Sequence, residues 1–297
     1  MILILIIFGF FFLLALFPFL KYYVLHLPTC IKATYKDIKK YITHKEKNVC
    51  PYVGRIFMFV ASGAQAFGSG KTLSMVAWLR MVYKEYNGLS VWDEENGCLT
   101  TQHIIIISNI ELKDIPYIPF RGRDQFVNID KLPHSPQDVI IFAIDEAGME
   151  FNSREYKTNL PTDFLVRLLQ CRHNRVSFCM TAQRFGFVDK LLRNCTGIVT
   201  TCLKRWRIVR LQEYDGYSLE NATNPDLIQP LSTKFYFAND DLFNSYDTNY
   251  NVEKLKQQLE DGDLLDTEEI LNRIQQTPNI EGVQNKLRKK YRSKEKR

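Results

Sequence analysis

Five consecutive residues in the first third of the sequence have the types and order that bind phosphate. They are Gly68, Ser69, Gly70, Lys71 and Thr72. Glycines let backbone N–H groups curl around phosphate oxygens, and a following helix adds the positive end of its dipole. We expect Lys71 to reach the β- and γ-phosphates of ATP and the Thr72 hydroxyl to bind Mg²⁺. Gln65 stands where the pattern G-x-x-x-x-G-K-[ST] has its first glycine. We therefore predict a variant loop, either with a different entry turn or with Gln65 in a conformation that usually calls for glycine.

An acidic pair further along the chain favours this chemistry over a chance match in a surface loop. Asp145 and Glu146 directly follow the wholly apolar run 139–144. Such a run is typical of a central parallel strand, and ligands bind at the carboxyl ends of such strands. We expect Asp145 to hold Mg²⁺ through water and Glu146 to deprotonate the water that attacks ATP. An exposed strand end that caps a helix is the alternative.

Polar residues flank a third apolar run, 176–180. Gln183 follows this run, and we expect it to sense the γ-phosphate, the alternative being a hydrogen bond that closes a turn. Arg172 precedes the run and is our candidate for an arginine that acts on the ATP of a neighbouring subunit. The sequence leaves Arg175 and Arg193 open for the same role. A residue acting between subunits implies a homo-oligomer, which we expect to be a ring.

The elements around these residues alternate between strands and amphipathic helices. We expect strands over 55–61, 104–107, 139–144, 176–180, 197–202 and 206–211, and helices over 71–86, 162–171 and 188–193. This alternation predicts a three-layer α/β fold of the P-loop NTPase type, with a mostly parallel sheet, over residues 51–248. Residues 249–297 are polar and basic, and we expect one or two helices and a tail there.

The N-terminus is apolar without interruption. Residues 2–20 contain no charged side chain and are long enough to cross a bilayer as a helix. A cleaved signal peptide is the alternative, but a basic leader and a small-residue cleavage site are both missing. We therefore expect a transmembrane anchor within residues 1–24. Lysines follow in the juxtamembrane segment 25–50, which places the N-terminus outside and the NTPase domain in the cytoplasm.

Those lysines are expected to lie against anionic lipid headgroups, in preference to DNA. The 297 residues carry a formal net charge of +6, concentrated after the apolar start and at the C-terminus. The 7 cysteines are dispersed and form no C-x-x-C pair. This pattern argues against a disulfide framework and against a cysteine metal site.

The motifs together resemble the zonula occludens toxin-like family of filamentous-phage assembly ATPases. The resemblance extends over roughly 53–248 and rests on G-S-G-K-T at 68–72, S-N-I at 108–110, D-E-A at 145–147, R-H at 172–173 and T-A-Q at 181–183. It implies an ATPase of the host inner (cytoplasmic) membrane that drives assembly and extrusion of phage, with single-stranded DNA or nucleoprotein and coat protein as partners. Gln65 departs from the family pattern, and so does an anchor that precedes the ATPase domain.

Two other functions stay open. One is a coupling-type ATPase that translocates DNA during plasmid transfer, and the other is a membrane scaffold that binds nucleotide without hydrolysing it. For DNA contacts we expect Arg154 and Lys157, with the rings of Phe151 and Tyr156 as stacking surfaces. The basic run 286–297 is either a solvated tail or a nucleic-acid or lipid contact.

Overall fold

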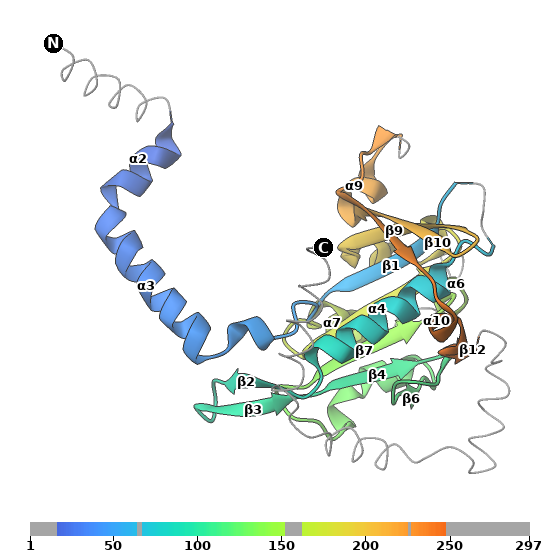
Figure 1. Ribbon diagram of the computed structural model, residues 1–297, viewed down its shortest axis with the longest axis horizontal. Coiled ribbons are helices and arrows are strands. Elements are labelled where there is room, and N and C mark those ends of the chain that lie inside the picture. The colour runs from blue at the N-terminus through green and yellow to red at the C-terminus, as the bar shows by residue number, and fades with distance from the viewer. Residues whose placement is uncertain (1–16, 64–66, 152–161, 225–226, 248–297) are drawn as a thin grey trace. The chain divides into compact units, whose positions relative to one another are not determined.

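The computed structural model describes residues 17–63, 67–151, 162–224 and 227–247 of the chain (Figure 1). The chain divides into two compact units. One contains the chain up to Asn48 together with Val91–Leu99, and the other contains Val49–Ser90 and the chain from Thr100 onward. The second unit holds every residue predicted for ATP chemistry.

The N-terminal unit is built on helices α2 (Pro18–Leu25) and α3 (Leu27–Thr43) and a 3-10 turn over Glu46–Asn48. It also includes the tip of the hairpin formed by β2 (Leu89–Asp93) and β3 (Cys98–Gln102). Most of the predicted anchor lies outside the described residues. Across the part of the chain that is described, the helices are too short or too polar to traverse a bilayer.

The larger unit is organised around one eight-stranded sheet in the order β11-β10-β9-β1-β8-β7-β4-β6. Every pair from β9 to β6 is parallel, while β9–β10 and β10–β11 are antiparallel. The strands are β1 (Ile56–Ala61), β4 (Ile104–Ser108), β6 (Ile118–Pro119), β7 (Val139–Ile144), β8 (Val176–Ala182), β9 (Ile198–Arg205), β10 (Ile208–Asp215) and β11 (Ser232–Phe237). The predicted mostly parallel sheet is confirmed.

Helices cover both faces of this sheet. They are α4 (Lys71–Tyr86), α5 (Arg123–Val127), α6 (Ala147–Glu150), α7 (Thr162–Leu169), α8 (Lys190–Cys195), α9 (Gly216–Asn221) and α10 (Asp240–Asn244), with 3-10 turns at Ile129–Lys131 and Phe185–Phe187. A two-stranded sheet pairs β5 (Glu111–Leu112) with β12 (Tyr246–Asp247).

Alternate side chains of the central strands belong to two separate hydrophobic cores, one on each face of the sheet. Ile140, Phe142 and Ile144 join the core on one face, while Val139, Ile141 and Ala143 join the core that packs on α4. In the first core the ring of Phe142 stacks on Phe178 with centroids 5.1 Å apart. A strand buried on both faces reads as a continuous apolar run, which is why β7 was visible in the sequence.

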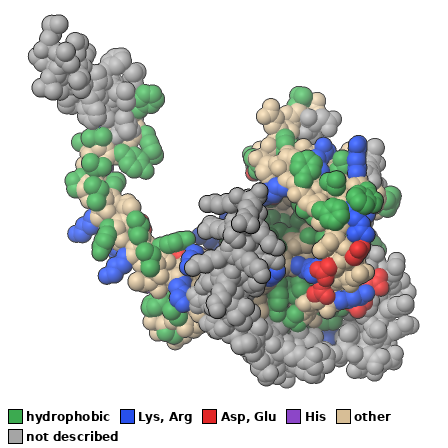
Figure 2. All heavy atoms as spheres, in the orientation of Figure 1, with side chains coloured by type: hydrophobic (Ala, Val, Ile, Leu, Met, Phe, Trp, Pro, Cys, Tyr) green, Lys and Arg blue, Asp and Glu red, His purple; other side chains and the backbone are tan. Residues whose placement is uncertain are grey.

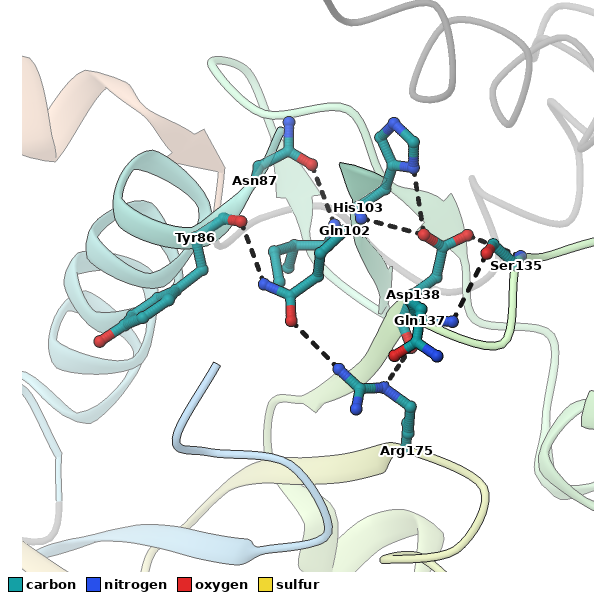
Figure 3. Close-up of polar contacts among 9 residues, drawn as sticks. Tyr86, Asn87, Gln102, His103, Ser135, Gln137, Asp138 and Arg175 are labelled. Carbon is teal, nitrogen blue, oxygen red and sulfur yellow. Dashed lines mark hydrogen bonds and ion pairs between the residues drawn. The ribbon is translucent and has the colours of Figure 1, made fainter. Parts of the chain in front are cut away.

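A polar network holds the amino-terminal edge of the sheet (Figure 3). The Asp138 carboxylate accepts from the backbone N–H of His103 at 2.9 Å. Gln102 donates to the carbonyl of Tyr86 at 3.2 Å and accepts from Arg175 Nη2 at 3.1 Å. Arg175 also donates to the carbonyl of Asp138 at 3.3 Å. These bonds tie the last turn of α4 to the starts of β4, β7 and β8.

One predicted strand begins later than expected. The run 206–211 was expected to be extended, but Trp206 has a φ of 55° and forms the turn between β9 and β10. The antiparallel hairpin requires this reversal. The strand therefore starts at Ile208 and continues to Asp215.

Candidate active site

The glycine-rich segment links β1 to α4, as predicted. Gly68 and Gly70 have φ values of 65° and 87°, which side chains other than glycine rarely adopt. Gly70 also approaches a neighbouring strand, because a Cβ atom placed on it would lie 3.2 Å from the Cβ of Lys204 in β9. Its carbonyl accepts from the N–H and hydroxyl of Ser74 at 2.9 and 2.7 Å, which starts the helix. Gln65 lies outside the described residues, so its effect on the loop stays a prediction.

Two side chains in this segment are held in the manner of a phosphate site. Ser69 is fully buried, and its hydroxyl has no hydrogen-bond partner within the described chain. A buried hydroxyl left without a partner costs about 1–3 kcal/mol, which a phosphate oxygen would relieve. Lys71, at the first position of α4, has a side chain only 7% exposed. The loop, the helix N-terminus, the orphaned hydroxyl and the ammonium group together fit the phosphates of a nucleotide.

The Thr72 hydroxyl reaches the predicted acidic pair. Thr72 Oγ1 donates to Asp145 Oδ1 at 2.9 Å. Thr181 Oγ1, near the end of β8, donates to the same carboxylate oxygen at 2.6 Å. Thr181 Oγ1 in turn accepts from the backbone N–H of Glu146 at 3.0 Å. The phosphate loop and the acidic pair are thus joined through a single carboxylate, with β8 as the bridge.

Asn109 fixes the backbone of Asp145 from the other side. The Asn109 side-chain amide donates to the Asp145 carbonyl at 2.9 Å, and its oxygen accepts from the Asp145 N–H at 2.7 Å. Asn109 directly follows β4, which pairs with β7 so that Ser108 faces Ala143. This two-bond clamp orients the carboxylate before any ligand binds.

Glu146 is held in a strained conformation. Its φ of 49° and ψ of 50° lie in the left-handed region. Such a conformation costs a residue other than glycine of the order of 1 kcal/mol and is concentrated at functional sites. Burial raises the pKa of the Glu146 carboxyl, Lys71 opposes this rise, and Asp145 adds to it. Lys71 Nζ lies 3.8 Å from Glu146 Oε1, a loose ion pair. A half-exposed carboxylate with a raised pKa suits a general base.

The oxygens at this edge fit Mg²⁺. The Thr72 hydroxyl and the Asp145 carboxylate lie within hydrogen-bond distance of each other, so one ion can be reached by both. Mg²⁺ takes one or two protein oxygens and completes its shell with water and phosphate oxygens. Within the described residues, no group of three or more His, Cys, Asp or Glu side chains could hold a metal. The two-oxygen set is therefore suited to an ion that arrives with a nucleotide.

The structure brings Gln183 to this edge and leaves Arg172 at the other. Gln183 directly follows β8, the strand between β1 and β7, and is partly exposed. Arg172 is exposed and lies in the turn that precedes β8. A seven-residue strand separates the two, which is about 20 Å. Arg172 cannot act on the ATP site of its own chain, and its role towards a neighbouring subunit stays a prediction.

The expectation that Phe151 offers a stacking surface to DNA bases is wrong. Its ring is 1% exposed and packs against Phe164, with centroids 5.5 Å apart, while the Arg123 guanidinium lies 5.7 Å from its centroid. It belongs to the core and offers no surface to a nucleic-acid base. Arg154, Tyr156 and Lys157 lie outside the described residues, as does the basic run 286–297.

Three contributors had no predicted role. Thr181 and Asn109 were part of motifs, but their contacts could not be predicted from the sequence. Lys204 comes from β9, which runs parallel to β1 and ends at the same edge of the sheet (Figure 1). Its ammonium lies 5.3 Å from the ring centroid of Phe243.

No family model matches the chain, and no curated protein matches it. Among solved structures, the N-terminal domain of zonular occludens toxin from Neisseria meningitidis is similar, with 18% identity over 66% of this chain and 100% of that one, at a TM-score of 0.42. The genome packaging NTPase B204 from Sulfolobus turreted icosahedral virus 2, in complex with ATP-gammaS, is similar with 13% identity over 63% of this chain and 98% of that one, at a TM-score of 0.40. EssC (ATPases 2 and 3) from Geobacillus thermodenitrificans is similar with 17% identity over 76% of this chain and 45% of that one, at a TM-score of 0.36.

Proposed function

We propose that this chain is a membrane-anchored ATPase that drives assembly and extrusion of filamentous, single-stranded DNA phage particles. The observation that carries the ATPase part is the junction at Asp145, where Thr72 and Thr181 both donate to one carboxylate oxygen. A surface loop with a chance G-S-G-K-T would have no reason to meet the end of a second buried strand.

Each residue at the junction has a distinct task in this proposal. Lys71 and the loop bind the phosphates, and Glu146 takes a proton from the attacking water. Thr72 and Asp145 hold Mg²⁺, which neutralises charge on the phosphates. Gln183, which follows β8 at this edge of the sheet, responds to the γ-phosphate in this proposal. Thr181 aligns Asp145 and the Glu146 backbone, so that the base and the metal ligand keep a fixed relation.

The phage and membrane parts rest on the sequence. The R-H and T-A-Q motifs support a phage assembly motor, with single-stranded DNA or nucleoprotein and coat protein as partners. The apolar run 2–20 and the lysines that follow support a single-pass anchor in the host inner membrane, with the N-terminus outside. A motor of this kind acts as a homo-oligomeric ring, in which one subunit can complete the ATP site of the next.

Glu146→Gln tests the chemistry. The amide keeps the shape of the side chain but cannot accept the proton, so we expect ATP binding to persist while kcat falls by about 10²- to 10⁴-fold. Nucleotide binding and phosphate release would be measured on the purified full chain. Glu95→Gln, at an exposed position in the β2–β3 turn, is the matched control and should leave both values unchanged.

Two results would redirect the proposal. Normal hydrolysis by Glu146→Gln would mean that another group is the base. Nucleotide binding by the unmodified chain without any hydrolysis, in membranes and with single-stranded DNA present, would favour the scaffold. In infected cells, Glu146→Gln should stop release of particles while coat protein accumulates in the membrane, and a defect in plasmid transfer alone would favour the coupling ATPase.

A further inference from the structure

Helix α3 exposes an apolar stripe along its whole length. Its 17 residues include none that is buried. Leu27, Ile31, Tyr35, Ile38 and Ile42 follow the spacing of a single helix face, and their exposed fractions are 52, 62, 71, 54 and 68%. A soluble helix normally turns such a face towards a protein core. Here the stripe packs against no core within the described part of the chain, which leaves it available to another apolar phase.

The opposite face of α3 is basic. Lys32, Lys36, Lys39 and Lys40 project about 120–220° around the helix axis from Leu27, whereas the apolar stripe lies between about 0° and 80°. Asp37 is the only acidic residue of the helix, so the four lysines leave α3 with a net charge of +3. Figure 2 shows green apolar side chains along this helix with blue lysines beside them. The charge excludes a helix that crosses a bilayer and matches one that lies on an anionic surface.

The C-terminal end of α3 is fixed to the hairpin tip. The His44 ring, directly after the helix, stacks on Trp92 with centroids 4.2 Å apart and an interplanar angle of 9°. Lys40 Nζ donates to Glu94 Oε1 at 3.4 Å. Both contacts lie on the side of the helix away from the apolar stripe. The hairpin thus holds α3 without covering its apolar face.

We propose that α3 lies in the plane of an anionic lipid bilayer, with its apolar stripe in the boundary between headgroups and acyl chains and its lysines at the lipid phosphates. The proposal shares with the proposed function only the need for a membrane, and it does not depend on ATP hydrolysis. It adds a second, electrostatic contact beyond the predicted anchor. Long lysine side chains can bury their methylenes at such a boundary while keeping the ammonium in water.

Site-specific labelling of the full chain tests this directly. Ile38→Cys and Lys36→Cys form a matched pair, since both side chains are exposed and belong to opposite faces. Both would be made with Cys30→Ser, Cys98→Ser and Cys195→Ser, which remove the three thiols that are not buried. Cys50 and Cys171 are buried, which keeps the dye from reaching them, and burial also raises the pKa of Cys50 to about 11 and that of Cys171 to about 12. The remaining cysteines, Cys179 and Cys202, are also buried, and burial raises the pKa of both thiols.

The labelled proteins would be reconstituted in vesicles of phosphatidylglycerol and phosphatidylcholine that carry a quencher on the acyl chains. We expect the dye at Ile38→Cys to be quenched at least fivefold more than the dye at Lys36→Cys. Replacing Lys32, Lys36 and Lys39 with Gln in the Ile38→Cys protein should reduce quenching at least twofold, and Lys40 is left to keep its contact with Glu94. Pure phosphatidylcholine vesicles should give the same reduction.

Equal quenching at the two positions in anionic vesicles would overturn the proposal, and so would quenching at Ile38→Cys that ignores lipid charge. The predicted anchor alone would hold the protein in vesicles in either case, so membrane attachment does not decide the result. ATP hydrolysis measured on the same vesicles separates the two proposals. If ATP is hydrolysed but the dye at Ile38→Cys is not quenched, only the interfacial helix is rejected. If the dye is quenched but ATP is not hydrolysed, only the ATPase proposal is rejected.

Discussion

The two edges of the parallel sheet both carry buried polar side chains. The two sets differ in hydrogen bonding, backbone strain and pKa. At the amino-terminal edge, the Arg175 guanidinium and the Asp138 carboxylate are each engaged by more than one group. At the carboxyl edge, the Ser69 hydroxyl has no partner among the described residues, Glu146 is strained, and its pKa is raised. A buried atom without a partner does not distinguish the edges, since His103 Nε2 at the amino-terminal edge also has none among the described residues. The carboxyl edge differs in combining such an atom with a strained residue and a raised pKa, which is typical of a ligand site.

The largest expected effect is at the carboxyl edge. Lys71→Ala removes the buried ammonium that faces the phosphates, and we expect kcat/KM for ATP to fall by about 10²- to 10³-fold or more. The free energy of unfolding should change little, because Glu146 is partly exposed and keeps water. Lys84→Ala, at an exposed position of the same helix, is the control and should leave kinetics unchanged. Comparable loss in both variants would mean that α4, and not the ammonium, had been damaged.

Arg175→Met at the amino-terminal edge should have the opposite profile. It removes the Arg175 donor from the Asp138 carbonyl and one of the two donors to Gln102 Oε1, whose bond from the Cys50 N–H remains, and we expect this to cost about 1–3 kcal/mol of the free energy of unfolding. Denaturant unfolding would measure this loss, and KM for ATP should stay within about twofold of the normal value. Arg167→Met, at a half-exposed position on α7, is a control for removal of an arginine. A large rise in KM would show that the two edges are not separate in function.

Thr181→Val sharpens the comparison, since Thr181 lies on the strand that connects the edges. The variant keeps the shape but loses the bonds to Asp145 and to the Glu146 N–H, so we expect kcat to fall about tenfold, or about 1.4 kcal/mol in the activation barrier. Steady-state hydrolysis is the measurement. Thr233→Val, exposed on β11, should be silent. An unchanged kcat in Thr181→Val would mean that Asn109 alone suffices to orient Asp145.

The smallest expected effect is on the pH dependence of kcat/KM, whose decrease towards low pH should be shifted to higher pH. The carboxylate form of Glu146 is the base, and it is lost as the pH falls through its pKa. Because burial raises this pKa above the ordinary value of 4.5, log kcat/KM should begin to fall at a higher pH than an unperturbed glutamate would allow. A limb centred at or below 4.5 would contradict the role of burial. Lys71→Arg should keep the limb in place, since the positive charge is retained.

The sequence was sufficient for the contiguous motifs and for the central strands. The loop at 68–72 and the pair at 145–146 could be read because their residue types are adjacent in the chain, and β7 could be read because it is apolar throughout. The bonds from Thr181 and Asn109 could not, since they depend on the register of β8 and β4 against β7. Long-range register is not encoded in any short stretch of sequence.

The placements that the sequence did not predict have equally specific causes. Arg172 and Gln183 flank one strand and so lie at opposite edges of the sheet, and the role of Arg172 towards a neighbouring subunit stays a prediction. Phe151 was assigned to the surface because it follows the acidic pair, whereas it is a core ring beneath α7. The β2–β3 hairpin and the edge strand β11 were not expected, because their half-polar sequences lack the continuous apolar signal of the central strands.

Strand β8 spans the sheet from one edge to the other and connects the two polar sites. It is paired along both sides, with β1 and with β7, and a strand held in this way resists stretching. Thr181 is near one end of it, and Arg175 directly precedes the other. One strand therefore carries, about 20 Å apart, a residue that orients Asp145 and the residue that fastens α4 to the starts of β4 and β7, so a shift of β8 along its axis would displace both together.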